Sequence, residues 1–262
     1  MKTHLDLFSG IGGFSIAAQN CGYRTVAFCE KEPYAQQILK ERFGAVLADS
    51  DERRSEQRHA QERRLSKPYA GNPRLHHDIF TLNGSDYRGV DLLTGGFPCQ
   101  PFSVAGKRRG ASDDRALWPE MLRVIDQSKP AWVLGENVAG IVTMELDNIL
   151  SDLEGIGYAA WPLVIPACAV DARHRRDRVW IVAHADKPRL QGRNSAVLPE
   201  CPGQCPPGQS GSFCSWPKES DWFPQSPICR VADGIPHRSH RLRALGNAIV
   251  PQVAEEIIRA IP

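Results

Sequence analysis

Short apolar runs alternate with amphipathic segments over residues 3–183. The apolar runs predict strands, and the stretches with apolar residues at helical spacing predict helices between them. The predicted strands are Leu5–Phe8, Arg24–Glu30, Val90–Gly95, Ala131–Glu136, Gly157–Pro166 and Arg178–Ala183. The predicted helices are Gly13–Cys21, Pro33–Phe43, Leu117–Gln127 and Asp147–Glu154. This alternation favours an α/β fold with a doubly wound, mostly parallel, Rossmann-like sheet, which binds ligands beyond the carboxyl ends of its strands.

Two segments interrupt the pattern. Residues 51–67 hold six basic and four acidic side chains and no apolar stripe, which predicts an exposed insertion; a phosphate-contacting arm is the alternative. Residues 188–236 hold nine of the twenty prolines and five glycines, which predicts an irregular module built of loops. Helical spacing then resumes at Arg241–Ile261.

These interruptions define the predicted domains. One domain comprises 1–183 and 240–262, with a polar insertion at 51–68, and a small irregular module comprises 184–239. The second part of the larger domain follows the module, so the module is inserted into that domain.

Composition narrows the class of protein. The chain is 42% hydrophobic and 24% charged, as in ordinary globular proteins, and its net charge of +2 does not by itself indicate a nucleic-acid partner. No apolar run is long enough for a membrane span, and the start MKTHLDLFSG does not read as a signal peptide. We therefore expect a cytoplasmic protein with reduced thiols. Four late cysteines could bind zinc with His237 or His240, but they lack paired C-x2-C spacing, so we predict no metal. These are Cys201, Cys205, Cys214 and Cys229.

The first motif is DLFSGIGGF at 6–14, where a predicted strand meets a helix through Gly10, Gly12 and Gly13. Glycines at such a turn let the backbone approach a ligand closely. A structural turn or a dinucleotide site is an alternative, although the spacing departs from G-x-G-x-x-G. Glu30 ends the next strand, where a carboxylate can bind ribose hydroxyls or simply lie on the surface.

The second motif is GGFPCQPFS at 95–103, which follows an apolar strand. Cys99 lies between Pro98 and Pro101, and the two prolines restrict the backbone on both sides of it. A thiol held in this way suits covalent catalysis. The alternative is a structural cysteine of the core.

Two further motifs carry charge at strand ends. Glu136 in GEN follows an apolar strand, where partial burial would raise its pKa towards neutrality; a helix-capping pair is the alternative. Arg176 and Arg178 alternate at the entry to another strand, so we expect them to share one face. Arginine can bind a carboxylate, a phosphate or a base edge, although an exposed strand start explains the pair equally well.

Taken together, these motifs resemble those of the DNA cytosine-5 methyltransferase family. The motifs that carry the resemblance are DLFSGIGGF, PCQPFS, ENV at 136–138, RRDRVWIV at 175–182 and GNAIVP at 246–251. The resemblance covers about 1–48, 75–183 and 228–262, and the compact core with its polar insertion resembles a phage or prophage enzyme.

The resemblance implies S-adenosylmethionine as the methyl donor. Phe8 would stack on the adenine, Glu30 would bind the ribose, and Asp78 with Ile79 would edge the adenine. The full donor-binding set that it implies is Phe8, Gly10, Gly12, Glu30, Asp78, Ile79, Pro98, Leu117 and Asn247. Asp49 competes with Asp78, and we favour Asp78 because it precedes the next strand at a distance similar to that in the family.

The resemblance also implies a catalytic set. Cys99 would attack C6 of a cytosine flipped out of double-stranded DNA, and Glu136 would hold N3 and the amino group. Arg178 would bridge Glu136 and the base, and Arg176 would support this network or a phosphate. Residues expected against the DNA are Gln100, Ser103, Lys107, Arg108, Arg109 and Arg115.

Some features depart from the family or leave alternatives. His174 stands where the family usually has glutamine, and the module at 184–239 is short, so the recognised site is not readable from it. The alternatives are a tRNA methyltransferase, a silent donor- or DNA-binding protein, and a nicotinamide oxidoreductase, in which PCQPFS would have no role. We expect a monomer, no membrane partner and, in the same system, a cognate restriction endonuclease.

Overall fold

A computed structural model describes residues 1–48, 71–98, 117–185 and 244–262. Contacts divide the chain into Met1–Asp186 with Leu242–Pro262, and a second unit, Lys187–Arg241, which falls outside the described residues. All described residues belong to the first unit. The predicted recognition role of 184–239 stays a prediction.

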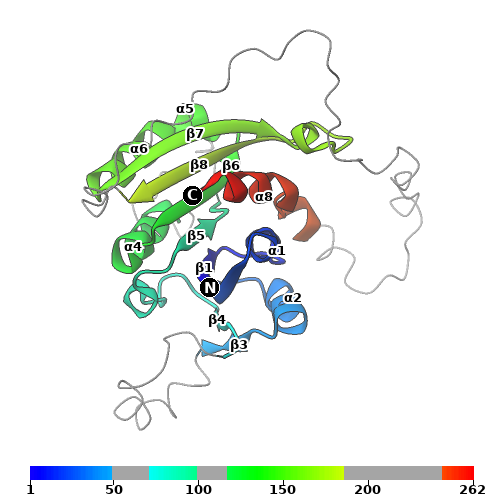
Figure 1. Ribbon diagram of the computed structural model, residues 1–262, viewed down its shortest axis with the longest axis vertical. Helices are drawn as coiled ribbons and strands as arrows, with labels where there is room; N and C mark the ends of the chain where they lie inside the picture. Colours follow the sequence, from blue (N-terminus) through cyan, green and yellow to red (C-terminus); the bar gives the residue numbers. More distant parts are fainter. Residues whose placement is uncertain (49–70, 99–116, 186–243) are drawn as a thin grey trace, which may run out of the picture. The chain divides into compact units, whose positions relative to one another are not determined.

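Within the described residues, eight strands form one sheet, in the order β3-β4-β2-β1-β5-β6-β8-β7 (Figure 1). The strands are β1 (Lys2–Leu7), β2 (Tyr23–Cys29), β3 (Val46–Leu47), β4 (Arg74–His76), β5 (Leu92–Gly95), β6 (Trp132–Val138), β7 (Tyr158–Pro166) and β8 (Asp177–Ala185). The pairs β6–β8 and β7–β8 are antiparallel and the other pairs are parallel. The predicted mostly parallel α/β sheet is confirmed.

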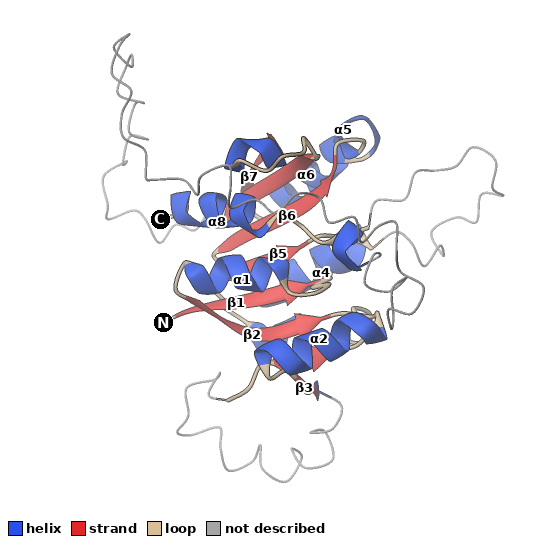
Figure 2. Ribbon diagram, turned by 90° about the vertical axis from the view of Figure 1, so that its right-hand side faces the viewer, coloured by secondary structure: helices blue, strands red, loops and turns tan. Residues whose placement is uncertain are grey.

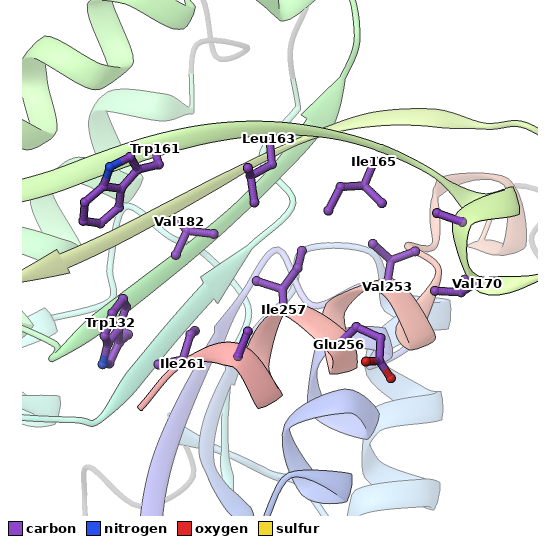
Figure 3. Close-up of a pocket in the computed structure, with 12 residues that line it drawn as sticks. Trp132, Trp161, Leu163, Ile165, Val170, Val182, Val253, Glu256, Ile257 and Ile261 are labelled. Atoms are coloured by element: carbon purple, nitrogen blue, oxygen red, sulfur yellow. The ribbon is translucent and has the colours of Figure 1, made fainter. Parts of the chain in front are cut away.

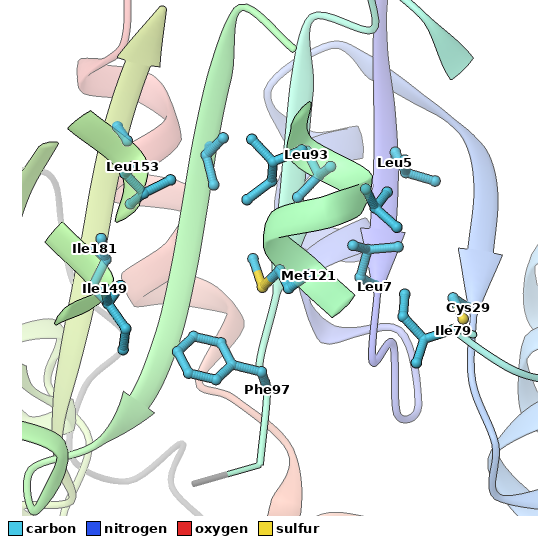
Figure 4. Close-up of a cluster of buried hydrophobic side chains, with 14 of the residues drawn as sticks. Leu5, Leu7, Cys29, Ile79, Leu93, Phe97, Met121, Ile149, Leu153 and Ile181 are labelled. Carbon is cyan, nitrogen blue, oxygen red and sulfur yellow. The ribbon is translucent and has the colours of Figure 1, made fainter. Parts of the chain in front are cut away.

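Helices cover both faces of this sheet. The described helices are α1 (Gly13–Asn20), α2 (Pro33–Phe43), α4 (Trp118–Ser128), α5 (Ile141–Met144), α6 (Leu146–Gly155) and α8 (Pro251–Ala260), with short 3₁₀ turns η2 (Gly84–Tyr87) and η3 (Ala167–Val170). Helices α1, α2 and α8 lie on one face (Figure 2). On the other face α4 and α6 bury the main core, in which Leu5, Leu7 and Met121 are fully buried (Figure 4).

Successive side chains of β1 point to opposite faces of the sheet, so this strand contributes residues to the interior on both sides. Leu5 and Leu7 point into the main core, whereas His4 and Asp6 are also fully buried but belong to the opposite face. Two polar side chains therefore lie inside the protein on the α1 side of the sheet.

The elements differ from those expected in two places. The strands β3 and β4 contain two and three residues, too few to show a period, and were not predicted. The helical spacing predicted over Arg241–Ile261 is seen at 244–247 and again in α8, but the helix is interrupted before Pro251. Proline has no N–H to donate and disfavours helical torsions at the preceding residue, and Val250 is extended (φ −89°, ψ 104°). In the ranges that the structure describes, no helix combines the length and the apolar character that crossing a membrane requires.

Candidate active site

Several predicted site residues directly follow strands whose last residues are paired with one another across the sheet. Leu7 of β1 pairs with Cys29 of β2 and Gly95 of β5, and the row continues from Cys29 to His76 of β4. On the other side, Gly95 pairs with Gly135 of β6. The residues that follow these positions therefore lie along one edge of the sheet. In spatial order they are Asp78, Glu30, Phe8, Gly96 and Glu136.

The segment after β1 is a tight turn with left-handed torsions. Phe8, Gly10 and Gly12 have φ values of 52°, 52° and 86°. A positive φ at the non-glycine Phe8 is a strained conformation, of the kind that often accompanies a binding site. The Glu30 carboxylate accepts hydrogen bonds from the backbone N–H groups of Gly10 and Glu32, both at 2.7 Å. Glu30 therefore holds the turn as well as facing the same edge.

Gly12 offers a test of this turn. A Cβ at this position would lie 2.5 Å from Cε2 of Phe43, so Gly12→Ala adds a steric clash to backbone strain. Gly22 has a similar φ of 80° with no atom within 4 Å of a Cβ, so Gly22→Ala is the matched control for strain alone. We expect urea denaturation to show Gly12→Ala about 1–3 kcal/mol less stable than Gly22→Ala. Equal losses would show that packing against Phe43 does not require glycine.

Burial raises the pKa of Glu30 above its ordinary value, and the backbone N–H groups partly oppose this by stabilising the charged form. On β4's side, Asp78 accepts a hydrogen bond from the N–H of Phe80 at 3.0 Å. Ile79 is buried, and Arg123 donates to its carbonyl at 2.7 Å. The turn at 78–80 is therefore held in place next to Glu30.

The remaining members of the predicted donor set differ in their surroundings. Leu117 is half-buried at the start of α4 and packs against the main core. Asn247 is exposed, and Pro98 is exposed at the end of the segment that follows β5. Asp49, the alternative to Asp78, lies outside the described residues.

A charged pair occupies the β6–β8 side of the edge. Nε of Arg178 lies 2.9 Å from Oε1 of Glu136, and the two side chains are only 22% and 11% exposed. Burial raises the pKa of Glu136, and the positive charge of Arg178 partly offsets this. A Cβ on Gly96 would lie 3.4 Å from Oε2 of Glu136, so the carboxyl directly adjoins the segment that leads to Cys99.

Asn137 fixes this segment. Its buried amide donates to the carbonyl oxygen of Phe97 at 2.8 Å, and the Phe97 ring packs against Trp118 with 5.2 Å between centroids. The backbone two residues before Cys99 is thereby tied to the end of β6. Asn137 is not among the predicted site residues, although its position in the GEN motif at 135–137 was the available signal.

Arg176 and Arg178 have different partners, although the charges of both act on Glu136. The strand β8 begins at Asp177, and Arg176 precedes it with a left-handed φ of 36°. Nη2 of Arg176 donates to the carbonyls of Gly246 and Ala248, at 2.8 and 2.7 Å. Arg176 therefore holds the backbone that carries Asn247, while Arg178 pairs with Glu136. Partial burial, together with repulsion from Arg178, lowers the pKa of Arg176.

Several predicted residues cannot be placed. Cys99, Gln100, Ser103, Lys107, Arg108, Arg109 and Arg115 lie outside the described residues. So do the four late cysteines considered for zinc. Across the described ranges, no cluster of three or more His, Cys, Asp or Glu side chains could hold a metal ion.

An apolar groove of about 480 Å³ lies elsewhere, between β7, β8 and α8 (Figure 3). Trp161, Val182 and Ile257 are among the residues that line it. None of the residues predicted to bind the donor or the base belongs to its lining.

A family model described as C-5 cytosine-specific DNA methylase matches residues 2–200. Type II methyltransferase M.NgoMIV of Neisseria gonorrhoeae is 30% identical over 185 residues, which cover 69% of this chain and 51% of that protein. M.BsuFI of Bacillus subtilis is 32% identical over 190 residues, covering 70% and 40%. M.HhaI of Haemophilus parahaemolyticus is 27% identical over 192 residues, covering 71% and 50%. The chain thus spans about half the length of the curated relatives it matches.

Solved structures agree on the fold. The S. pombe Dnmt2 methyltransferase superposes with a TM-score of 0.54 at 22% identity, covering 71% of this chain and 52% of that one. A mutant of Spodoptera frugiperda DNMT2 gives a TM-score of 0.54 at 20% identity, with 75% and 54% covered. At such identities the likeness concerns the fold alone.

Proposed function

The chain belongs to the C-5 cytosine-specific DNA methylases, and on that premise we propose that it transfers a methyl group from S-adenosylmethionine to C5 of cytosine in double-stranded DNA. The observation that carries the proposal is the row of strand ends along one edge of the sheet. The residues expected to bind the methyl donor follow β4, β2 and β1, and the residues expected to act on the cytosine follow β5 and β6. A donor on one side would therefore adjoin a base on the other.

The residues present fit the donor. The left-handed turn at Phe8–Gly12 lets the backbone approach a ligand closely, and the buried Glu30 carboxylate keeps oxygen lone pairs for the two ribose hydroxyls. Asp78 and Ile79 follow the next strand in register, where an adenine ring would meet them. When bound, S-adenosylmethionine supplies an electrophilic methyl group on its sulfur.

The base side fits covalent catalysis. In the proposed reaction, the Cys99 thiolate forms a bond to C6 of the base, and Glu136 shares its proton with N3. C5 thereby becomes nucleophilic enough to take the methyl group. Loss of the C5 proton to a base then re-forms the double bond and expels the Cys99 thiolate. Arg178, paired with Glu136 at 2.9 Å, would orient the carboxyl and contact the base carbonyl.

A cytosine inside a duplex cannot reach this edge, so we propose that it is flipped out of the stack. Lys107, Arg108 and Arg109 would contact phosphates, Gln100 and Ser103 would lie against the DNA, and 184–239 would choose the sequence. We further propose a monomer that acts in the cytoplasm, where its DNA substrate is, together with a cognate restriction endonuclease.

The decisive experiment measures transfer of labelled methyl groups to double-stranded DNA and, in parallel, to tRNA. Bisulfite sequencing of host DNA from cells that express the chain then reports the methylated cytosine and its context. We expect label in DNA cytosine. Label in tRNA alone would replace the DNA substrate with RNA, and donor binding without transfer to either would indicate a binding protein.

A further inference from the structure

Five buried side chains beneath the glycine turn form a closed ring of hydrogen bonds. His4 contacts Thr25 Oγ1 through Nδ1 at 3.0 Å and Thr94 Oγ1 through Nε2 at 2.8 Å. Thr25 Oγ1 lies 3.1 Å from Ser15 Oγ, which lies 2.7 Å from Oδ2 of Asp6. Thr94 Oγ1 closes the ring at 3.3 Å from Oδ1 of Asp6. All five side chains are at most 3% exposed.

Counting hydrogens limits the states of this ring. Five bonds need five hydrogens, and the three hydroxyls supply three of them. The remaining two come either from a protonated Asp6 with a neutral His4, or from a doubly protonated His4 with an ionised Asp6. An ionised Asp6 beside a neutral His4 would leave one bond without a hydrogen. Only two states therefore place a hydrogen in all five bonds of the ring, and both have the same number of protons.

Burial distinguishes the two states. In the ionic state, one hydroxyl separates the imidazolium from the carboxylate on one side of the ring and two hydroxyls separate them on the other, so two charges would be buried without direct contact. In the neutral state, every donor faces an acceptor in one continuous direction around the ring, which strengthens the bonds cooperatively. Burial raises the pKa of Asp6 to about 8 and lowers the pKa of His4 to about 3, in agreement with the neutral state.

We propose that Asp6 is an uncharged hydrogen-bond donor at neutral pH, and that the ring it completes is the positioning device for the glycine turn. The ring joins β1, β2 and β5 to Ser15 in the first turn of α1, so it fixes both ends of the turn at Phe8–Gly12. It also reaches Thr94, two residues before Gly96. The protonation state is independent of the proposed function, whereas the effect on donor binding rests on it.

The titratable groups around Asp6 are few. His4 lies in the ring on the same strand, and Glu30 and Cys29 at the end of β2 also interact with Asp6. The negative charge of Glu30 raises the pKa of Asp6 and so favours the protonated form. From α1, the hydroxyl and the backbone N–H of Ser15 both contact the Asp6 carboxyl and favour its charged form, but the effect of burial on the pKa of Asp6 is larger.

Nuclear magnetic resonance of the wild-type protein tests the protonation state directly. We expect the Asp6 carboxyl carbon at neutral pH to have the chemical shift of a protonated acid, and His4 to have one protonated and one bare ring nitrogen. A carboxylate shift for Asp6, with both His4 nitrogens protonated, would overturn the proposal. This measurement needs neither donor nor DNA.

Two substitutions of Asp6 test the positioning role. In Asp6→Asn, the amide donates to Thr94 and accepts from Ser15, so the ring survives. Asp6→Leu keeps the branched shape of the side chain, but the Ser15 and Thr94 hydroxyls each lose one of their two partners in the ring. Calorimetry is expected to give Asp6→Asn a donor affinity within about threefold of wild type, and Asp6→Leu a loss of roughly tenfold or more. Wild-type affinity in Asp6→Leu would overturn the positioning role. Donor binding by none of the three proteins would instead refute the proposed function and leave the resonance result standing.

The pH dependence of stability gives a second readout if Asp6→Leu does not fold. Asp6 ionises near 3.8 when exposed in the unfolded chain and near 8 in the folded protein. As pH rises from about 4 to about 8, the unfolded chain releases this proton first, so the wild type loses stability. Asparagine does not titrate, so Asp6→Asn should not show this loss. The urea midpoint of Asp6→Asn should therefore rise relative to the wild-type midpoint as pH increases from about 4 to about 8. A constant difference between the two midpoints would contradict a protonated Asp6.

Discussion

Cys99→Ser is expected to reduce methyl transfer by about 10⁴-fold or more, by analogy with the loss of other enzymatic nucleophiles. The serine hydroxyl is almost unionised at neutral pH and is a poor nucleophile towards C6 of a pyrimidine. Donor affinity should stay near the wild-type value, because the donor residues follow β4, β2 and β1. Transfer of labelled methyl groups to DNA and calorimetry with the donor measure the two quantities separately.

Cys168→Ser is the matched control, since Cys168 is an exposed free cysteine in η3. It should methylate DNA like the wild type. Transfer by Cys99→Ser at more than about a tenth of the wild-type rate would mean that no bond from this thiol is needed, and the covalent mechanism would then be wrong.

Glu136→Gln is expected to lower kcat by roughly 10²–10⁴-fold, the usual contribution of a positioned general acid. The carboxamide keeps the shape of the side chain but has no acidic proton to share with N3. Burial raises the pKa of Glu136, so the protonated form persists to higher pH than for an exposed glutamate. The wild-type rate that depends on this proton should therefore fall as pH rises through that raised pKa.

The measurement for Glu136→Gln is kcat across a pH series. The alkaline fall due to Glu136 should disappear in the variant, while donor affinity is unchanged. Glu154→Gln changes an exposed carboxylate on α6 and should leave both the rate and the pH profile as in the wild type. An unchanged pH profile in Glu136→Gln would assign the proton to another group.

The sequence predicted elements best where their ends carry strong local signals. The prediction of α2 is confirmed at both ends, because Pro33 occupies its first turn and Gly44 ends it with a φ of 66°. β1 begins three residues and β2 one residue before the predicted starts, because the pairing of Lys2 with Tyr23 extends the ladder beyond the apolar run.

The spatial arrangement of the site residues was harder to predict from the sequence than the elements were. Motifs predicted that Glu30 and Asp78 serve one pocket, but their proximity follows from the register of β2 and β4, two strands far apart in the sequence. Likewise, the spacing of Arg176 and Arg178 does not show that they have different partners, because the carbonyls of Gly246 and Ala248 that Arg176 binds are far from it in the sequence. The ring beneath the turn was not predicted, because no local pattern relates His4 to Thr94.

The packing of α8 against α1 has a consequence for the order in which the protein is made. Ala17 and Ala18 are completely buried in the cluster to which Val253 and Ile257 of α8 belong. These partners leave the ribosome more than 230 residues after α1. Contacts between such distant segments form late, because a long loop must close first. The glycine turn should therefore remain incompletely supported throughout synthesis of 184–239. A nascent chain would then become able to hold its donor only after the residues proposed to read DNA have been made.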